Sequence, residues 1–189
     1  YVLEFGANYI RIFKDGGIVT ETGKTISGAT AANPVVVTAT SHGFSNGDRV
    51  YIKDVVGMTQ LNNREFTVAN KTTNTFELSG VDGTGFDAYT SGGTAGKIVE
   101  VTSTYSVTDI FEINFTQSAD VLYLAHKDHE PAKLTRTSDT SWTLTDIDFI
   151  DGPWLDENDT TTTMYASAAT GSGITITASA ATFSSNDVG

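Results

Sequence analysis

The chain has 189 residues, with 11 lysines and arginines against 23 aspartates and glutamates, which gives a formal net charge of −12. Such an acidic chain lacks the excess of basic residues on which non-specific nucleic-acid binding and docking to anionic membranes depend. No apolar run approaches the roughly 20 residues of a membrane-spanning helix. The sequence contains no cysteine, which excludes disulfide scaffolds, thiol catalysis and Cys-ligated metal sites.

Residues that favour strands dominate the composition. Threonine, valine, isoleucine, phenylalanine and tyrosine are abundant beside 18 glycines, a combination typical of β structure with many tight turns. No ten-residue window shows helical periodicity. The best helical candidate is a single turn at 106–111, with Ser106 as its cap and Asp109 near its positive end. We therefore predict an all-β fold.

The chain opens with a predicted hairpin. Residues 2–5 and 9–13 are rich in apolar, β-branched and aromatic side chains, and 18–19 resume a strand. The Lys-Asp-Gly-Gly segment at 14–17 predicts a turn, because glycine adopts the positive φ that tight hairpin turns require.

The pattern changes between residues 25 and 98. Short strands are predicted at 35–38 and 49–55, around Phe66 and Val68, and around Phe76 and Leu78. Alternation within 49–55 predicts one buried and one exposed face. The glycine-rich segment 80–96 is predicted as a long loop or irregular hairpin. We expect a compact barrel of about five or six strands.

After residue 98 the pattern of the opening segment returns. Strands are predicted at 121–125, 134–136, 142–145, 147–150 and 174–177, with a polar linker near 156–163. A hairpin loop tolerates an insertion at small entropic cost. We therefore predict one discontinuous domain from 1–24 and 99–155, an inserted barrel module at 25–98, and a linker with the start of a further, truncated β segment at 156–189.

Two segments concentrate potential metal ligands. Residues 126–130 read His-Lys-Asp-His-Glu, but their spacing matches no metal motif and is better interpreted as a polar hairpin tip closed by Pro131. Residues 146–159 carry six acidic side chains without the pattern of a calcium-binding loop. Asp146 and Asp148 are interpreted as the solvent face of a strand, and Ca²⁺ in this segment is left open. We predict no metal site.

No motif in the chain predicts catalysis. A Gly-x-Ser-x-Gly elbow and a phosphate-binding loop are both missing from the sequence, and residues 80–85 have the wrong spacing for a dinucleotide fingerprint. Paired carboxylates for glycoside hydrolysis are recognised by distance and not by sequence. We predict that the protein is not an enzyme, with no catalytic residues and no cofactor.

Exposed aromatic side chains are candidates for stacking on sugars. Tyr89 lies in the glycine-rich segment and Trp154 follows a Gly-Pro pair, and these two are the candidate glycan contacts. Trp142 is flanked by Thr143 and Leu144 and is better interpreted as a core residue.

Several motifs of the middle segment carry a family resemblance. They are Ser-His-Gly-Phe at 41–44, Gly-Asp-Arg-Val-Tyr-Ile at 47–52, Val-Gly-Met-Thr-Gln-Leu-Asn at 56–62, Phe-Thr-Val at 66–68 and Thr-Phe-Glu-Leu at 75–78. Residues 25–98 resemble a small β module of phage structural proteins that is similar to the first catalytic-cysteine half-domain of ubiquitin-activating enzymes. The resemblance implies a barrel-like fold. It implies no ubiquitin chemistry in a chain that lacks cysteine and an adenylation motif.

The flanking segments resemble a different family. The motifs are found at 1–6, 9–13, 15–17, 117–124, 129–134 and 142–144, and they resemble the tail nozzle (tail tubular B-like) proteins of short-tailed phages over residues 1–24 and 99–155. That resemblance implies a propeller-like body of antiparallel hairpins, of which six copies form the end of the tail tube. Such proteins are usually several times longer, so we expect this chain to be a fragment.

These expectations define a leading function and an alternative. The leading function is that of a non-enzymatic virion protein, made in the host cytoplasm and built into a phage tail tube through which DNA passes. Its partners would be other tail proteins and copies of itself in a hexameric ring, and an acidic lining would repel phosphate, so no tight DNA binding and no membrane insertion are expected. The alternative is an adhesin-like module that binds a host-surface glycan through Tyr89 and Trp154. Open sheet edges of a fragment are also able to pair between copies.

Overall fold

The computed structural model describes residues 1–149 and 161–181. Within them the chain forms strands and one short 3₁₀ helix, and every strand pair is antiparallel. The prediction of an all-β fold built from several antiparallel sheets is therefore confirmed. No helix in this part of the chain is long and apolar enough to cross a membrane. The chain divides into two compact units, Tyr1–Asp148 and Phe149–Gly189.

The first sheet combines the start of the chain with a strand near residue 100. Its strands are β1 (Val2–Gly6), β2 (Tyr9–Lys14), β3 (Gly17–Ile18) and β11 (Glu100–Thr102). Strand β2 lies between β1 and β11 and also pairs with β3. At the predicted turn, Asp15 and Gly16 have φ values of 52° and 82°. The hairpin predicted at the start of the chain is thus present, with its turn in the left-handed conformation that the Asp-Gly sequence favours.

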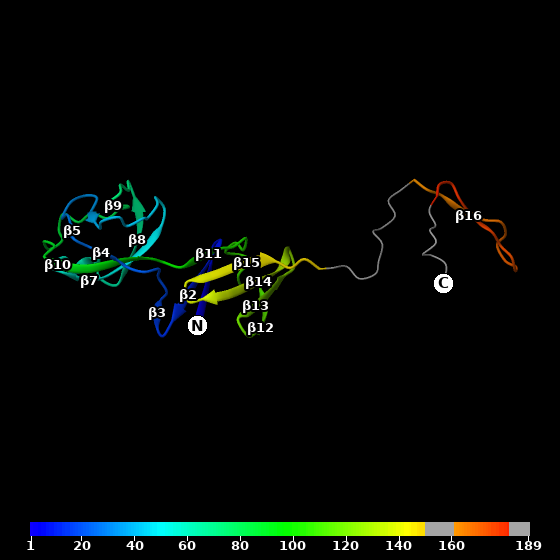
Figure 1. Cartoon of the computed structure of the whole chain (residues 1–189), viewed down its shortest axis with the longest axis horizontal. Coiled ribbons are helices and arrows are strands. Elements are labelled where there is room, and N and C mark those ends of the chain that lie inside the picture. Colours follow the sequence, from blue (N-terminus) through cyan, green and yellow to red (C-terminus); the bar gives the residue numbers. More distant parts are fainter. Residues whose placement is uncertain (150–160, 182–189) are drawn as a thin grey trace. The chain divides into compact units, whose positions relative to one another are not determined.

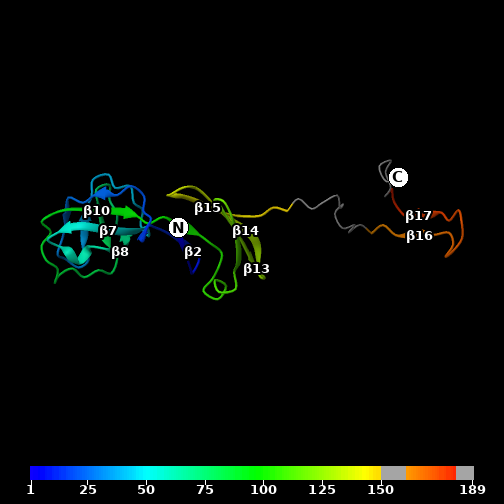
Figure 2. The same ribbon diagram turned by 90° about the horizontal axis from the view of Figure 1, so that it is seen from below.

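The segment between β3 and β11 forms a separate seven-stranded sheet. Its strands are β4 (Lys24–Thr25), β5 (Gly28–Ala29), β6 (Val36–Thr38), β7 (Arg49–Val56), β8 (Arg64–Ala69), β9 (Thr75–Leu78) and β10 (Ser91–Lys97), with the 3₁₀ helix η1 (Thr59–Leu61) between β7 and β8. We refer to residues 24–97 as the module. Figures 1 and 2 show its strands gathered into one rounded body.

The module is barrel-like without a continuous closed ladder. The strand order is β4-β10-β7-β8-β9-β6-β5, so β4 and β5 are the outer strands. These two strands are consecutive pieces of the segment 24–29. Between them, Ile26 N–H donates to the Gly93 carbonyl at 3.0 Å and Ser27 N–H donates to the Thr38 carbonyl at 2.9 Å. Strand β4 pairs with β10 and strand β5 pairs with β6. The short segment that connects β4 to β5 therefore joins the two outer strands of the sheet and completes the ring that strand pairing leaves open.

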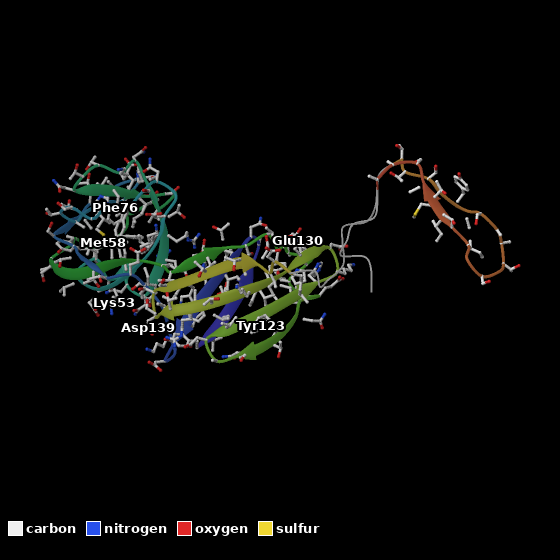
Figure 3. The ribbon with its side chains drawn as sticks, turned by 45° about the vertical axis from the view of Figure 1, so that its right-hand side comes forward. Lys53, Met58, Phe76, Tyr123, Glu130 and Asp139 are labelled. Carbon is white, nitrogen blue, oxygen red and sulfur yellow. The ribbon has the colours of Figure 1, made fainter. Side chains whose placement is uncertain are left out.

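Alternation along the strands fills the interior of the module. Val50 and Ile52 of β7 and Phe76 of β9 are completely buried, as is Met58 before η1. Figure 3 shows Met58 and Phe76 pointing into the module, whereas Lys53 lies on its surface. Burial of apolar side chains at about 25 cal/mol per Å² is the main source of stability for such a core. The core is therefore built by the face that the sequence alternation predicted.

The glycine-rich segment differs from its prediction. Residues 91–96, expected within a loop or irregular hairpin, belong to β10, which pairs with β7 and β4. Glycine is unfavourable in strands unless another chain segment approaches closely. Here a Cβ atom on Gly93 would lie 2.6 Å from Val55 Cγ2, and one on Gly96 would lie 2.7 Å from Thr20 Oγ1. Close packing against neighbouring segments explains why this strand is rich in glycine.

The chain enters and leaves the module at adjacent points. Thr20 and Ile98 form an isolated antiparallel bridge. Beside it, Val99 N–H donates to the Val19 carbonyl at 2.9 Å, and Glu21 N–H donates to the Lys97 carbonyl at 2.7 Å. The segment that enters the module from β3 and the segment that leaves it toward β11 therefore run side by side.

A third sheet follows the module in the sequence. It consists of β12 (Asn114–Ser118), β13 (Val121–His126), β14 (His129–Ser138) and β15 (Ser141–Asp146), paired in that order. Trp142 is half-buried and packs against a cluster formed by Ile12, Val19 and Val99 in and beside the first sheet, so it lies at the margin of the core and not within it. Of the predicted strand 147–150, residues 147–149 are not in a strand and residue 150 lies outside the described residues.

The second unit contains one described hairpin. Strand β16 (Met164–Ala166) pairs with β17 (Ile176–Ala178), so the strand predicted at 174–177 is shifted toward its C-terminal side. The described residues form separate sheets and not the propeller-like body that the family resemblance implied.

Candidate interaction surface

The cluster at 126–130 forms the tip of the β13–β14 hairpin. His126 and His129 are opposite each other in the strand pairing, and their ring centroids lie 4.9 Å apart. Asp128 N–H donates to His126 Nδ1 at 3.1 Å. The side chains converge because the two-residue turn brings the strand ends together. This agrees with the interpretation of the segment as a hairpin tip.

His129 connects this tip to the preceding loop. Its Nε2 atom lies 3.1 Å from Asp109 Oδ2. The backbone N–H and the hydroxyl of Ser106 each donate to the same carboxylate at 2.8 Å. These bonds, with that to His129, hold the pKa of Asp109 well below its usual range. Residues 106–112 form hydrogen-bonded turns rather than a helix, and Asp109 closes the turn where the single helical turn was predicted.

The buried histidine of the tip has one unsatisfied ring nitrogen. His126 Nε2 has no hydrogen-bond partner and lies 3.8 Å from Glu112 Oε2. Among residues 1–149 and 161–181, no group of three or more histidine, aspartate and glutamate side chains is arranged to hold a metal ion. The cluster therefore acts as a packed connection between the hairpin and the 104–112 loop.

The acidic segment is only partly described. Asp146 ends β15 and Asp148 follows it, and both side chains are exposed. Phe149, expected on the buried face, is 63% exposed. The remaining acidic positions of this segment lie outside the described residues, so Ca²⁺ binding there stays open.

The two candidate glycan contacts differ in what the structure shows of them. Tyr89 is half-buried and packs against the core of the module. Its hydroxyl lies 3.0 Å from the carbonyl oxygens of both Ile26 and Gly92. Part of its ring and its hydroxyl therefore serve the fold. Trp154 lies outside the described residues. Glycan binding by these two residues stays a prediction.

Strand β12 presents the most open backbone edge of the third sheet. It is the outer strand beside β13, and all five of its residues are exposed. Phe115 is 73% exposed. This strand was not predicted, because Asn-Phe-Thr-Gln-Ser has one apolar residue and shows no clear alternation. The Ser-Ala-Asp turn that follows it was the signal available. An exposed edge strand is a template for pairing with another chain.

A cavity beside β12 shows how the sheets are layered. Its volume is about 200 Å³, and its lining includes Leu3 from β1, Gln117 from β12 and Leu122 from β13. Strand β1 therefore faces the β12–β13 hairpin. Strand β1 is the outer strand of the first sheet. Phe115 of β12 is left exposed to solvent.

Several residues that line this cavity make ionic and aromatic contacts with one another and with their neighbours. The ring of Tyr1 meets Trp142 edge to face at 5.3 Å between centroids, and Arg136 lies over Tyr1 at 5.1 Å. Asp139 accepts hydrogen bonds from the Tyr1 hydroxyl and from Lys14, the latter at 2.7 Å. Arg136 also donates two bonds to Asp120 at 2.6 and 2.9 Å. These groups satisfy one another and fix β1 against the third sheet.

Comparison with known proteins finds a match only for the part of the chain that contains the module. No curated protein matches the chain. A family model described as the ubiquitin-activating enzyme E1 FCCH domain matches residues 32–98. This range contains β6–β10, so the match concerns the barrel-like module and not the two sheets that precede and follow it. Residues 32–98, which include most of the module, are therefore similar to the FCCH domain of ubiquitin-activating enzyme E1.

Proposed function

We propose that this chain is part of a non-enzymatic structural protein of a phage tail. In this protein, a domain of β-hairpins carries an FCCH-like module as an insertion. The tail tube or nozzle is the site that the flanking motifs favour. Its partners are copies of itself and other tail proteins. The module is read as a structural insertion, since the chain has no cysteine for ubiquitin transfer.

The observation that carries this proposal is the way in which the module is inserted. Strands β2 and β11 pair directly although the module separates them in sequence. The entry and exit strands are joined by the Thr20–Ile98 bridge. An insertion with adjacent ends adds a folded body while leaving the host sheet continuous. Such an arrangement supports a decorated structural protein.

The chemistry of the described residues supports a structural role. The sequence has three histidines, and each is used in packing or local hydrogen bonding. His42 accepts a hydrogen bond from Phe44 N–H at Nδ1 and contacts the Thr75 carbonyl through Nε2. His126 and His129 pack on each other at the hairpin tip. Packing and local hydrogen bonds thus explain the position of each histidine without a role in a reaction.

The test is electron microscopy of the full-length protein that contains this chain, with class averages sorted by rotational symmetry. Six-fold rings with a central channel are expected from the nozzle resemblance. Elongated trimers or monomers would contradict the nozzle assignment and favour a fibre or adhesin. Labelling of purified phage particles with an antibody against this chain provides the second arm, because a tail protein must be found at the tail.

A further inference from the structure

We infer that the module binds an acidic saccharide on its outer surface, with one sugar ring seated in a groove beside β7 and β10. The groove has a volume of about 250 Å³ and is lined by Thr20, Gly23, Tyr51, Lys53, Thr94 and Gly96. It is a different site from the one predicted at Tyr89, whose hydroxyl serves the fold. Binding at this groove does not depend on the proposed tail function.

The shape of the groove follows from the register of the strands. Tyr51 on β7 lies opposite Gly96 on β10, so β10 places no side chain beside the tyrosine. Gly23, just before β4, also lacks a side chain, and a Cβ atom there would lie 3.3 Å from Thr94 Cβ. Glycine in a strand marks a place where another molecule or chain segment approaches the backbone closely. The backbone of the two glycines therefore forms the base of the groove, and Tyr51 borders it.

The polar groups that line the groove are available to a ligand. Lys53 is exposed, and Figure 3 shows it on the surface of the module. Within residues 1–149 and 161–181, the Lys53 ammonium forms no ion pair, and the hydroxyls of Thr20 and Thr94 form no hydrogen bond. One cation and two hydroxyls of the groove are thus left without a partner in the chain.

Charge complementarity favours an anionic ligand. Lys53 is the one charged side chain among the lining residues, in a chain with a net charge of −12. Glu65 lies opposite Tyr51 on β8, but its carboxylate already accepts hydrogen bonds from Arg11 and Arg49. A carboxylate of the ligand therefore meets a cation that no group of the protein neutralises, and such charge-assisted hydrogen bonds are stronger than neutral ones.

The aromatic ring and the hydroxyls favour a sugar over an acidic peptide. The Tyr51 ring is half-buried, and its hydroxyl lies 3.4 Å from Asn63 Oδ1. The negative face of an aromatic ring attracts the C–H groups on the apolar face of a pyranose, while the sugar hydroxyls match those of Thr20 and Thr94. The groove is smaller than the roughly 300–1,000 Å³ of pockets for drug-sized ligands, so it accommodates one sugar ring.

A magnetic resonance titration of the ¹⁵N-labelled chain tests the ligand class. The probe is trigalacturonate, and its fully methyl-esterified form is the matched neutral ligand. We expect the amide signals of Gly23, Thr94 and Gly96 to shift with trigalacturonate, with a Kd on the order of 1 mM. The ester should bind at least about tenfold more weakly. An absence of shifts at about 10 mM trigalacturonate, or equal binding of the ester, would overturn the inference. Equally tight binding of triglutamate would also overturn it, in favour of an acidic peptide.

Two substitutions test the groove itself. Lys53→Gln removes the cation and should weaken trigalacturonate binding at least about tenfold, and Tyr51→Ala should weaken it by a similar factor. The matched control is Lys71→Gln, an exposed lysine elsewhere on the module, which should bind like the wild type. Because Lys53 is exposed, Lys53→Gln should keep the wild-type unfolding temperature, so its loss of binding is not a loss of the fold. Unchanged binding in both groove variants would refute the site and leave the tail proposal intact.

Discussion

The guanidinium group of Arg11 on β2 lies 3.2 Å from the carboxylate of Glu65 on β8, and thereby joins the first sheet to the module. Arg11 also donates to Glu100 at 2.8 Å, and Glu65 accepts from Arg49 at 2.9 Å. Burial opposes the charge of Arg11, but the hydrogen bond to Glu100 and the charges of Glu65 and Glu100 raise its pKa above the ordinary value. This network, together with the Thr20–Ile98 bridge, links the module to the sheet that carries it.

We expect Glu65→Gln to lower the free energy of unfolding by about 1–2 kcal/mol, since it removes the charge that faces two arginines. Urea unfolding measures the loss. The control is Glu130→Gln, an exposed position on β14 that Figure 3 marks, where the change should stay within about 0.5 kcal/mol. Equal effects at the two positions would mean that the Arg11–Glu65–Arg49 network adds no stability.

Asp109 predicts a pH dependence at acidic pH. Hydrogen bonds from the Ser106 backbone and side chain and from His129 hold its pKa well below the ordinary value of an aspartate. The unfolded chain therefore takes up a proton before the folded chain does, and stability contributed by Asp109 is present above the ordinary pKa and lost as the pH falls toward the folded value. We expect the stability difference between the wild type and Asp109→Asn to shrink as the pH falls below about 4. Unfolding curves at several pH values check this, and a difference independent of pH would contradict it.

His126 predicts a contrast between two substitutions. Its side chain is buried and touches Tyr105 and His129, but Nε2 has no hydrogen-bond partner. His126→Ala removes the ring contacts and should cost about 2–3 kcal/mol. His126→Phe keeps a ring and removes the unsatisfied nitrogen, so its cost should stay below about 1.5 kcal/mol. Thermal unfolding of both variants decides the matter. Both variants lose the acceptor of the Asp128 N–H hydrogen bond, so a phenylalanine variant that is the less stable of the two would mean that the larger ring does not fit the site.

We predict that the position of Gly93 in β10 does not tolerate a side chain. Its φ is +95°, and a Cβ atom would lie 2.6 Å from Val55 Cγ2. Gly93→Ala should therefore destabilise the module by about 2 kcal/mol or more, through both strain and overlap. Gly85→Ala is the matched control, because a Cβ atom there would meet nothing within 4 Å. Chemical denaturation of the two variants should separate them clearly, and equal stability would show that β10 moves to make room.

Much of the module was accessible from the sequence because alternation and burial coincide there. Val50 and Ile52 share the buried face of β7, and Phe76 and Leu78 share that of β9. Strand β10 was not accessible, because its glycines resemble those of a loop until Val55 and Thr20 are seen to pack against them. Strand β12 was missed for a related reason: all of its side chains are exposed, so burial leaves no periodic pattern in the sequence.

The sequence by itself determined the β character of this protein and the turns at which many strands end, because strand propensity and glycine-containing turns act over a few neighbouring residues. It also marked the change of pattern at the borders of the module. Only the tertiary structure decided that β2 pairs with β11, although the module separates them in sequence, and that β12, which carries Phe115, is the outer strand of its sheet. These features depend on strand order and on which edges remain unpaired, and such relationships join residues that are far apart in the chain.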